Sequence, residues 1–136
     1  MGHDCTWYIP SKVILANVYG SVDQQELITL DHTLTRLLQD DAHYSGTHVI
    51  IDIKHAENLP GLRAYRDIKW YQHPQVEWTV MCNIRKPFIR FMVYTVAQML
   101  SAEARSYVAD SREGALAFLA DVDMHVAREM MHSRDT

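Results

Sequence analysis

Residues 13–23 read Val13-Ile14-Leu15-Ala16-Asn17-Val18-Tyr19-Gly20-Ser21-Val22-Asp23, and they indicate a strand, a tight corner and the start of a helix. The aliphatic and β-branched residues before Gly20 are typical of a buried strand. Asp23 is a favourable helix N-cap, and Glu26 three residues later completes the pattern of a capping box. A strand that leads through a glycine corner into a helix is typical of α/β domains.

The chain on either side of this corner alternates between strand and helix patterns. Residues 5–9 and the turn at residues 10–12 predict a hairpin with the strand at residues 13–19. The helix after Asp23 has leucines at helical spacing, so one of its faces should be buried. The β-branched run at residues 48–53 predicts a strand that is covered on both faces.

Five further elements follow along the chain. Leu62, Tyr65 and Ile68 predict a second helix that ends near Tyr71, and residues 76–82 predict a strand. Pro87 suits the first turn of a third helix running to about residue 104. Residues 107–109 predict a short last strand, and Ser111 a cap for one final helix. The order β-β-α-β-α-β-α-β-α predicts an α/β fold with a four- or five-stranded mixed sheet and four helices.

Composition sets the broad class. The 136 residues suffice for one domain, with a core at about residues 6–123 and an extension at residues 124–136. The net charge of -4 argues against a nucleic-acid binder held by bulk charge. No apolar run reaches the roughly 18 residues that a membrane span needs, and the polar N-terminus is not a signal peptide. We therefore expect a soluble, cytoplasmic protein in which Cys5 and Cys82 are buried thiols.

The element order and the corner from Gly20 to Asp23 resemble the STAS domain of anti-sigma-factor antagonists, the SpoIIAA-like group. The stretch Asp110-Ser111-Arg112-Glu113 is similar to the last strand-to-helix junction of that group. The resemblance covers about residues 6–123. It implies a regulatory domain that docks a partner protein under the control of a phosphorylated serine.

The serine switch of that group is missing here. Asp52-Ile53 matches the end of its third strand, and Gly61 matches its loop glycine. Lys54 follows Ile53, however, and no serine or threonine lies between Thr47 and Thr79. The resemblance therefore implies a divergent member of the group that lacks the phosphorylatable serine.

Two surfaces are candidate binding sites. Ligands of open α/β sheets bind beyond the carboxyl ends of the strands, where helix N-termini add positive potential. The residues expected at this rim, as a site for an anion or a partner's carboxylate, are Lys54, His55, Gly61, Arg63, Arg85, Lys86 and Arg112. A solvated rim of mixed charge is the alternative. The third helix should also expose an aromatic stripe, which predicts an interface made of Trp70, Phe88, Phe91 and Tyr94, with packing inside the fold as the alternative.

Catalysis and metal binding receive less support. Cys82 has no base nearby in sequence, and no phosphate-binding or nucleophile motif is present. His48 and His55 are expected at opposite ends of one strand, too far apart to share an ion, and we expect them to be solvent-exposed or capping. We therefore predict no enzyme, no catalytic residue, no metal and no cofactor. The predicted function is a protein-interaction module that could form a homodimer, and the alternative is a domain that binds a small anionic or lipid-like ligand at the rim.

Overall fold

The computed structural model describes residues 2–40, 46–65, 68–100 and 105–135. Five strands form one mixed sheet in the order β1-β2-β3-β4-β5. β1 (Gly2–Ile9) pairs antiparallel with β2 (Val13–Ser21), and β3 (Thr47–Asn58), β4 (Val76–Cys82) and β5 (Arg105–Val108) continue the sheet in parallel. The α/β class, the mixed five-stranded sheet and the number of helices are as predicted.

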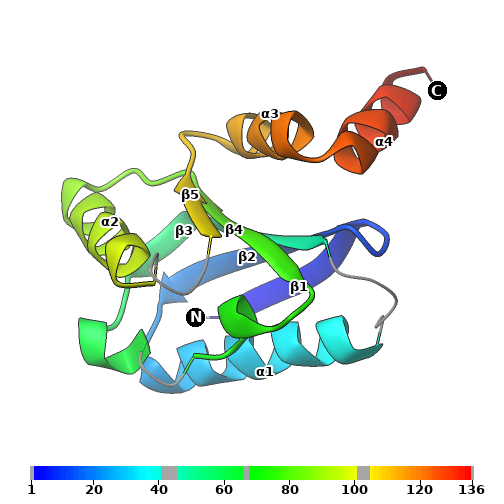
Figure 1. Cartoon of the computed structure of the whole chain (residues 1–136). Coiled ribbons are helices and arrows are strands. Elements are labelled where there is room, and N and C mark those ends of the chain that lie inside the picture. The colour runs from blue at the N-terminus through cyan, green and yellow to red at the C-terminus, as the bar shows by residue number, and fades with distance from the viewer. Residues whose placement is uncertain (1, 41–45, 66–67, 101–104, 136) are drawn as a thin grey trace.

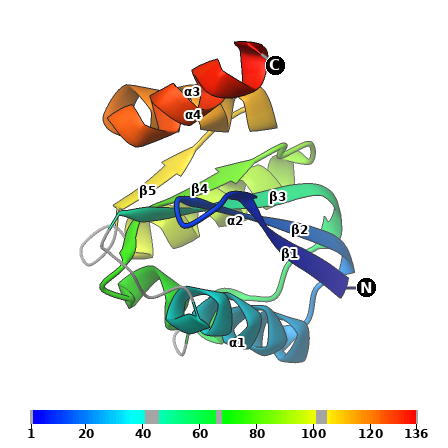
Figure 2. The same cartoon turned by 90° about the vertical axis from the view of Figure 1, so that its right-hand side faces the viewer.

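The helices cover both faces of the sheet in three layers (Figures 1 and 2). α1 (Gln24–Asp40) and α2 (Pro87–Leu100) lie on one face, and α3 (Arg112–Val122) and α4 (Met124–Asp135) lie on the other. Two apolar clusters result, one on each side of the sheet. The larger cluster lies under α1 and α2, where the leucines of α1 at positions 27, 30, 34 and 38 are buried.

The predicted caps begin the helices at the predicted residues. The Asp23 carboxylate accepts a hydrogen bond from the backbone N–H of Glu26 at 2.8 Å, and α1 starts at the next residue. The Ser111 hydroxyl accepts one from the backbone N–H of Gly114 at 3.0 Å and begins α3. The Glu26 side chain does not complete the capping box, because it contacts the ring of His3 instead, at 2.8 Å.

The second predicted helix is wrong. The segment after β3 forms two short 3₁₀ turns, Leu62–Tyr65 and Trp70–Gln72. The apolar residues of this segment recur every third position, which is the period of a 3₁₀ helix and not of an α-helix. The Asp31 carboxylate on α1 accepts hydrogen bonds from the backbone N–H groups of Lys69 and Trp70, so the segment satisfies its backbone without an α-helix.

The single final helix is wrong as well. The chain breaks at Asp123, whose backbone is extended, and continues as α4. Val122 is exposed at this break. β3 is also longer than predicted: it reaches Asn58 and therefore contains Lys54 and His55, which were expected to follow it.

Candidate functional site

The carboxyl ends of β2 and β3 border an open polar pocket of about 450 Å³. At its base, the guanidinium of Arg112 donates to the Asp52 carboxylate at 2.9 Å and to the side-chain oxygen of Asn17 at 2.9 Å. Asn83, which follows β4 with a positive φ of 62°, donates to the same carboxylate at 3.0 Å. Burial alone would raise the pKa of Asp52, but hydrogen bonds from Asn83, the Lys54 backbone and Arg112 bring it below its ordinary value.

Only part of the predicted rim gathers at this pocket. Lys54, His55 and Arg112 line it together with Asp4 and Glu113, so its charge is mixed. The other predicted residues lie outside the lining and are exposed, namely Gly61, Arg63, Arg85 and Lys86. The Lys86 ammonium donates to the backbone carbonyl of Glu57 at 3.1 Å. Because Asp52 already neutralises Arg112, the pocket offers an external anion less positive charge than the sequence suggested.

A second cavity lies inside the larger apolar cluster, between the sheet and the layer of α1, α2 and the 3₁₀ turns. Its volume is about 50 Å³. The lining comes from every element of this layer and from the sheet, and includes Leu27, Leu30, Ile51, Tyr65, Ile68 and Val96. In the part of the chain that the structure describes, no acidic, basic or histidine side chain lines this cavity.

Four polar residues of the cavity lining are nine-tenths buried, namely Tyr65, Trp70, Tyr71 and Thr79. Trp70 is 6% exposed and so is Thr79. The indole Nε1 of Trp70 and the hydroxyl of Thr79 have no hydrogen-bond partner among the described residues. Buried polar groups are nearly always paired, because leaving one unpaired costs about 1–3 kcal/mol. Two such groups on one apolar cavity therefore mark it as a candidate binding site.

The aromatic stripe of α2 has the predicted exposure where it is described. Phe91 is 67% exposed and Tyr94 is 48% exposed, whereas Ile89, Val93 and Val96 on the inner side are buried. The side chain of Phe88 lies outside the described residues. Trp70 does not extend the stripe, because it is in the core, where its ring forms a T-shaped pair with the ring of Tyr71. The assignment of Trp70 to the interface is therefore wrong.

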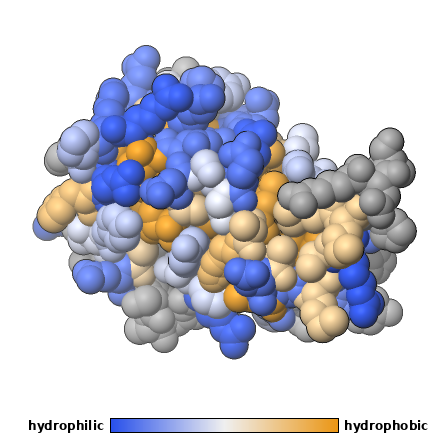
Figure 3. Space-filling model, turned by 90° about the horizontal axis from the view of Figure 1, so that it is seen from above, coloured by the Kyte–Doolittle hydropathy of each residue, from blue (hydrophilic) through white to orange (hydrophobic). Residues whose placement is uncertain are grey.

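The opposite side of the molecule also has exposed apolar side chains. Figure 3 looks onto α3 and α4 and shows apolar atoms gathered beside hydrophilic ones. The large apolar residues exposed on these two helices are Val122, Met124 and Met131. Sequence analysis predicted one final helix after Ser111, and Val122 lies beside the break at Asp123 that divides this helix in two.

The expectation of an exposed or capping His48 is wrong. Its side chain is completely buried, and Nε2 donates to the Asp123 carboxylate at 2.8 Å. Lys12 donates to the same carboxylate oxygen at 3.1 Å. Burial would raise the pKa of Asp123, but hydrogen bonds from His48, Lys12 and the His125 backbone lower it to about 2. These bonds fasten the α3–α4 junction to the amino ends of the parallel strands. Sequence could not reveal them, because His48 and Asp123 are 75 positions apart.

Both cysteines are free thiols, and Cys82 is buried as predicted, whereas Cys5 is only partly buried. Burial, followed by the nearby charge of Asp52, raises the pKa of Cys82 to about 12. Burial raises the pKa of Cys5 to about 12 as well. A thiol with such a pKa stays protonated near neutral pH, and the thiolate is the nucleophilic form.

Comparison with family models and with curated proteins finds no match for this sequence. Among the helices that the structure describes, none has both the length and the apolar character needed to cross a membrane.

Proposed function

We propose that this chain is a non-enzymatic binding domain for a small, uncharged, largely apolar molecule that carries a hydrogen-bond acceptor. The observation that supports the proposal is the pair of unpartnered buried groups, Trp70 Nε1 and Thr79 Oγ1, on one apolar cavity. An indole N–H can only donate, and a threonine hydroxyl can donate as well as accept. A carbonyl or ether oxygen of a ligand would satisfy one or both of them.

The uncharged lining of the cavity also indicates that the ligand is neutral. A carboxylate or an ammonium group would lose its hydration in the cavity and would meet no opposite charge from the lining residues. Burying an unpaired charge costs far more than one hydrogen bond returns. We therefore infer a neutral ligand, which departs from the anionic ligand that the sequence suggested for the rim.

The size of the cavity limits what can enter. A volume of about 50 Å³ is below the ~300–1,000 Å³ of most ligand pockets. It accommodates a few non-hydrogen atoms, so the occupant is either a very small molecule or the end group of a longer one. A longer ligand would have to displace part of the covering layer, of which the 3₁₀ turns at Leu62–Tyr65 and Trp70–Gln72 are the least regular part.

Native mass spectrometry of the protein purified from its own source tests this proposal. We expect a single retained organic molecule per chain that is released on unfolding and is neutral at pH 7. The test variant is Val96→Leu, which adds one methylene group to the cavity lining and should reduce the fraction of chains that retain the molecule. A bare mass for the wild-type protein, together with an unchanged melting temperature in the presence of small ketones, would contradict the proposal.

A protein-interaction role is the second candidate, and the exposure of Phe91 and Tyr94 favours it. Aromatic side chains are enriched at the centres of interfaces, where each contributes a large apolar area. A two-fold homodimer would use the same stripe on both chains. The resemblance to SpoIIAA-like regulators supports the same role, although the loop at residues 58–62 has no hydroxyl side chain to phosphorylate.

A further inference from the structure

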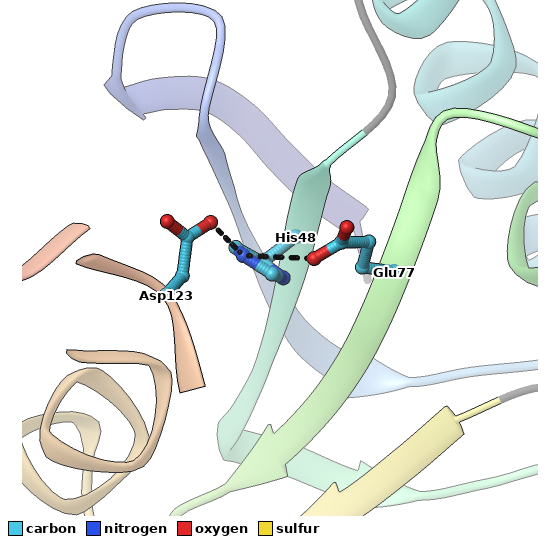
Figure 4. Close-up of side chains that lie close together, drawn as sticks. All are labelled: His48, Glu77 and Asp123. Atoms are coloured by element: carbon cyan, nitrogen blue, oxygen red, sulfur yellow. Dashed lines mark hydrogen bonds and ion pairs between the residues drawn. The ribbon is translucent and has the colours of Figure 1, made fainter. Parts of the chain in front are cut away.

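Three potential metal ligands meet at the amino ends of the parallel strands, far in sequence from one another. His48 is the second residue of β3, Glu77 is the second residue of β4, and Asp123 lies at the α3–α4 junction. Figure 4 shows the ring of His48 between the two carboxylates. The Nε2 atom of His48 is 2.8 Å from Asp123 Oδ2 and 3.9 Å from Glu77 Oε2, and the three ligand atoms all lie within 4.8 Å of one another.

The two separations measured from His48 Nε2 are close to those of a tetrahedral metal site. Ligands that are each about 2.0–2.1 Å from a zinc ion are about 3.3 Å from one another. One of the two distances from His48 is shorter than this value and the other is longer, by about half an ångström each. Glu77 has a half-exposed side chain and can move by that amount, whereas His48 is fixed in the core.

The charges of the site favour a cation. Two carboxylates face one ammonium, that of Lys12, which is 3.1 Å from Asp123 Oδ2. With a neutral imidazole, the four groups have a net charge of about -1. Lys12 is partly exposed and is otherwise held by the backbone carbonyl of Gly46 at 3.1 Å, so it can withdraw into solvent when an ion arrives.

We propose that His48, Glu77 and Asp123 form a site for a divalent transition-metal ion, with zinc the best match, and that Lys12 occupies the place of the ion when no metal is bound. One imidazole nitrogen with two carboxylates is a ligand set that zinc accepts, whereas Mg²⁺ and Ca²⁺ prefer oxygen ligands alone. A fourth position would remain for water at the exposed side of Glu77. The proposal does not depend on the apolar cavity, which lies on the other face of the sheet.

Binding requires one proton to move. The Nε2–H of His48 now donates to Asp123, and a metal ion needs the lone pair of that nitrogen. The proton would pass to Nδ1, which has no partner among the described residues, so the ring stays neutral. The ion would then link β3 and β4 to the α3–α4 junction, and a ligand that binds only the folded chain raises its stability.

Calorimetric titration with Zn²⁺, together with thermal unfolding, tests the proposal on the full chain. We expect one zinc per chain and a rise in melting temperature. Glu77→Gln is the variant with least risk to folding, and it should weaken binding by at least about tenfold, since even outer-shell changes cost that much. Lys12→Met should strengthen binding by about tenfold or more, the effect of removing a unit charge about 5 Å from a divalent ion even in water.

The chain has eight histidines, so zinc could also bind elsewhere on its surface. His32→Gln, which changes an exposed histidine on α1 at the opposite face of the sheet, is therefore the matched control and should leave the affinity unchanged. Equal zinc affinity in the wild type, Glu77→Gln and Lys12→Met would overturn the proposal, and so would the absence of binding in Lys12→Met. Equal affinity for Mg²⁺ would contradict the choice of zinc.

Discussion

Replacing Thr79 with valine should stabilise the ligand-free protein. The hydroxyl of Thr79 is buried without a partner among the described residues, and valine keeps the shape of the side chain while replacing the hydroxyl with a methyl group. An unpaired buried group costs about 1–3 kcal/mol, so its removal should raise the free energy of unfolding by about 1–2 kcal/mol. For a chain of 136 residues this corresponds to a rise in melting temperature of about 3–7 °C.

Thr47 provides a matched control. It is also a buried threonine in the sheet, but its hydroxyl donates to the backbone carbonyl of Ser11 at 3.3 Å. Thr47→Val should therefore lower the free energy of unfolding, by about 0.5–1.5 kcal/mol. Both changes replace a threonine in a strand with valine, so differences in β propensity do not separate them.

Urea and thermal unfolding of the two variants, refolded from denaturant to remove any retained ligand, provide the comparison. Thr79→Val should also gain less stability than the wild type from millimolar 2-butanone, a neutral molecule with one carbonyl acceptor. If Thr79→Val destabilises the chain as much as Thr47→Val does, the hydroxyl has a partner inside the protein. The argument for a ligand acceptor at this position would then fail.

Three further predictions concern the surface and the two ion-paired clusters. Phe91→Glu should convert a dimer into a folded monomer, which sedimentation velocity would show; a wild type that is already monomeric at micromolar concentration would contradict the homodimer. Arg112→Met should lower the free energy of unfolding, measured in urea, by about 1–3 kcal/mol, because the buried Asp52 loses its charged partner. Arg85→Met, at an exposed position, should have little effect, and equal effects of the two changes would show that the ion pair between Arg112 and Asp52 does not stabilise the fold. Folding lowers the pKa of Asp123 from 3.8 to about 2, so the ionised carboxylate stabilises the folded chain above about pH 4, and this stabilisation is lost as the pH falls toward 2. Between pH 4 and pH 2 the free energy of unfolding should therefore fall by about 2 kcal/mol less in Asp123→Asn than in the wild type. Identical dependence on pH in the two proteins would contradict this prediction.

Local patterns in the sequence predicted most of the fold. The strand at residues 76–82 has the predicted bounds, and α1, α2 and α3 begin beside Asp23, at Pro87 and after Ser111 as expected. Each of these depends on a signal within a few residues, such as a cap, a proline or a β-branched run. The predicted helix after Pro60 failed because a three-residue apolar repeat was interpreted as α-helical, although it also suits a 3₁₀ turn.

The candidate sites were harder to predict, because they depend on contacts between distant residues. The break at Asp123 has no glycine or proline to mark it, and it is held by His48 and Lys12, which lie 75 and 111 positions earlier in the chain. The apolar cavity likewise depends on how Trp70 and Thr79 pack against α1 and α2. The rim of basic residues was predicted from topology, but the pairing of Arg112 with Asp52 changes its charge.

The indole N–H of Trp70 provides the most direct test of the proposed binding function. The chain has three tryptophans, and Trp78 packs against Phe118 on the opposite face of the sheet, so its resonance is an internal control. In a ¹H–¹⁵N spectrum of the wild-type protein, titration with 2-butanone should shift the Trp70 indole resonance in a saturable, downfield manner, leave that of Trp78 in place, and have a weaker effect in Thr79→Val. An unchanged Trp70 resonance, or equal and unsaturable shifts of all three indoles, would contradict the account.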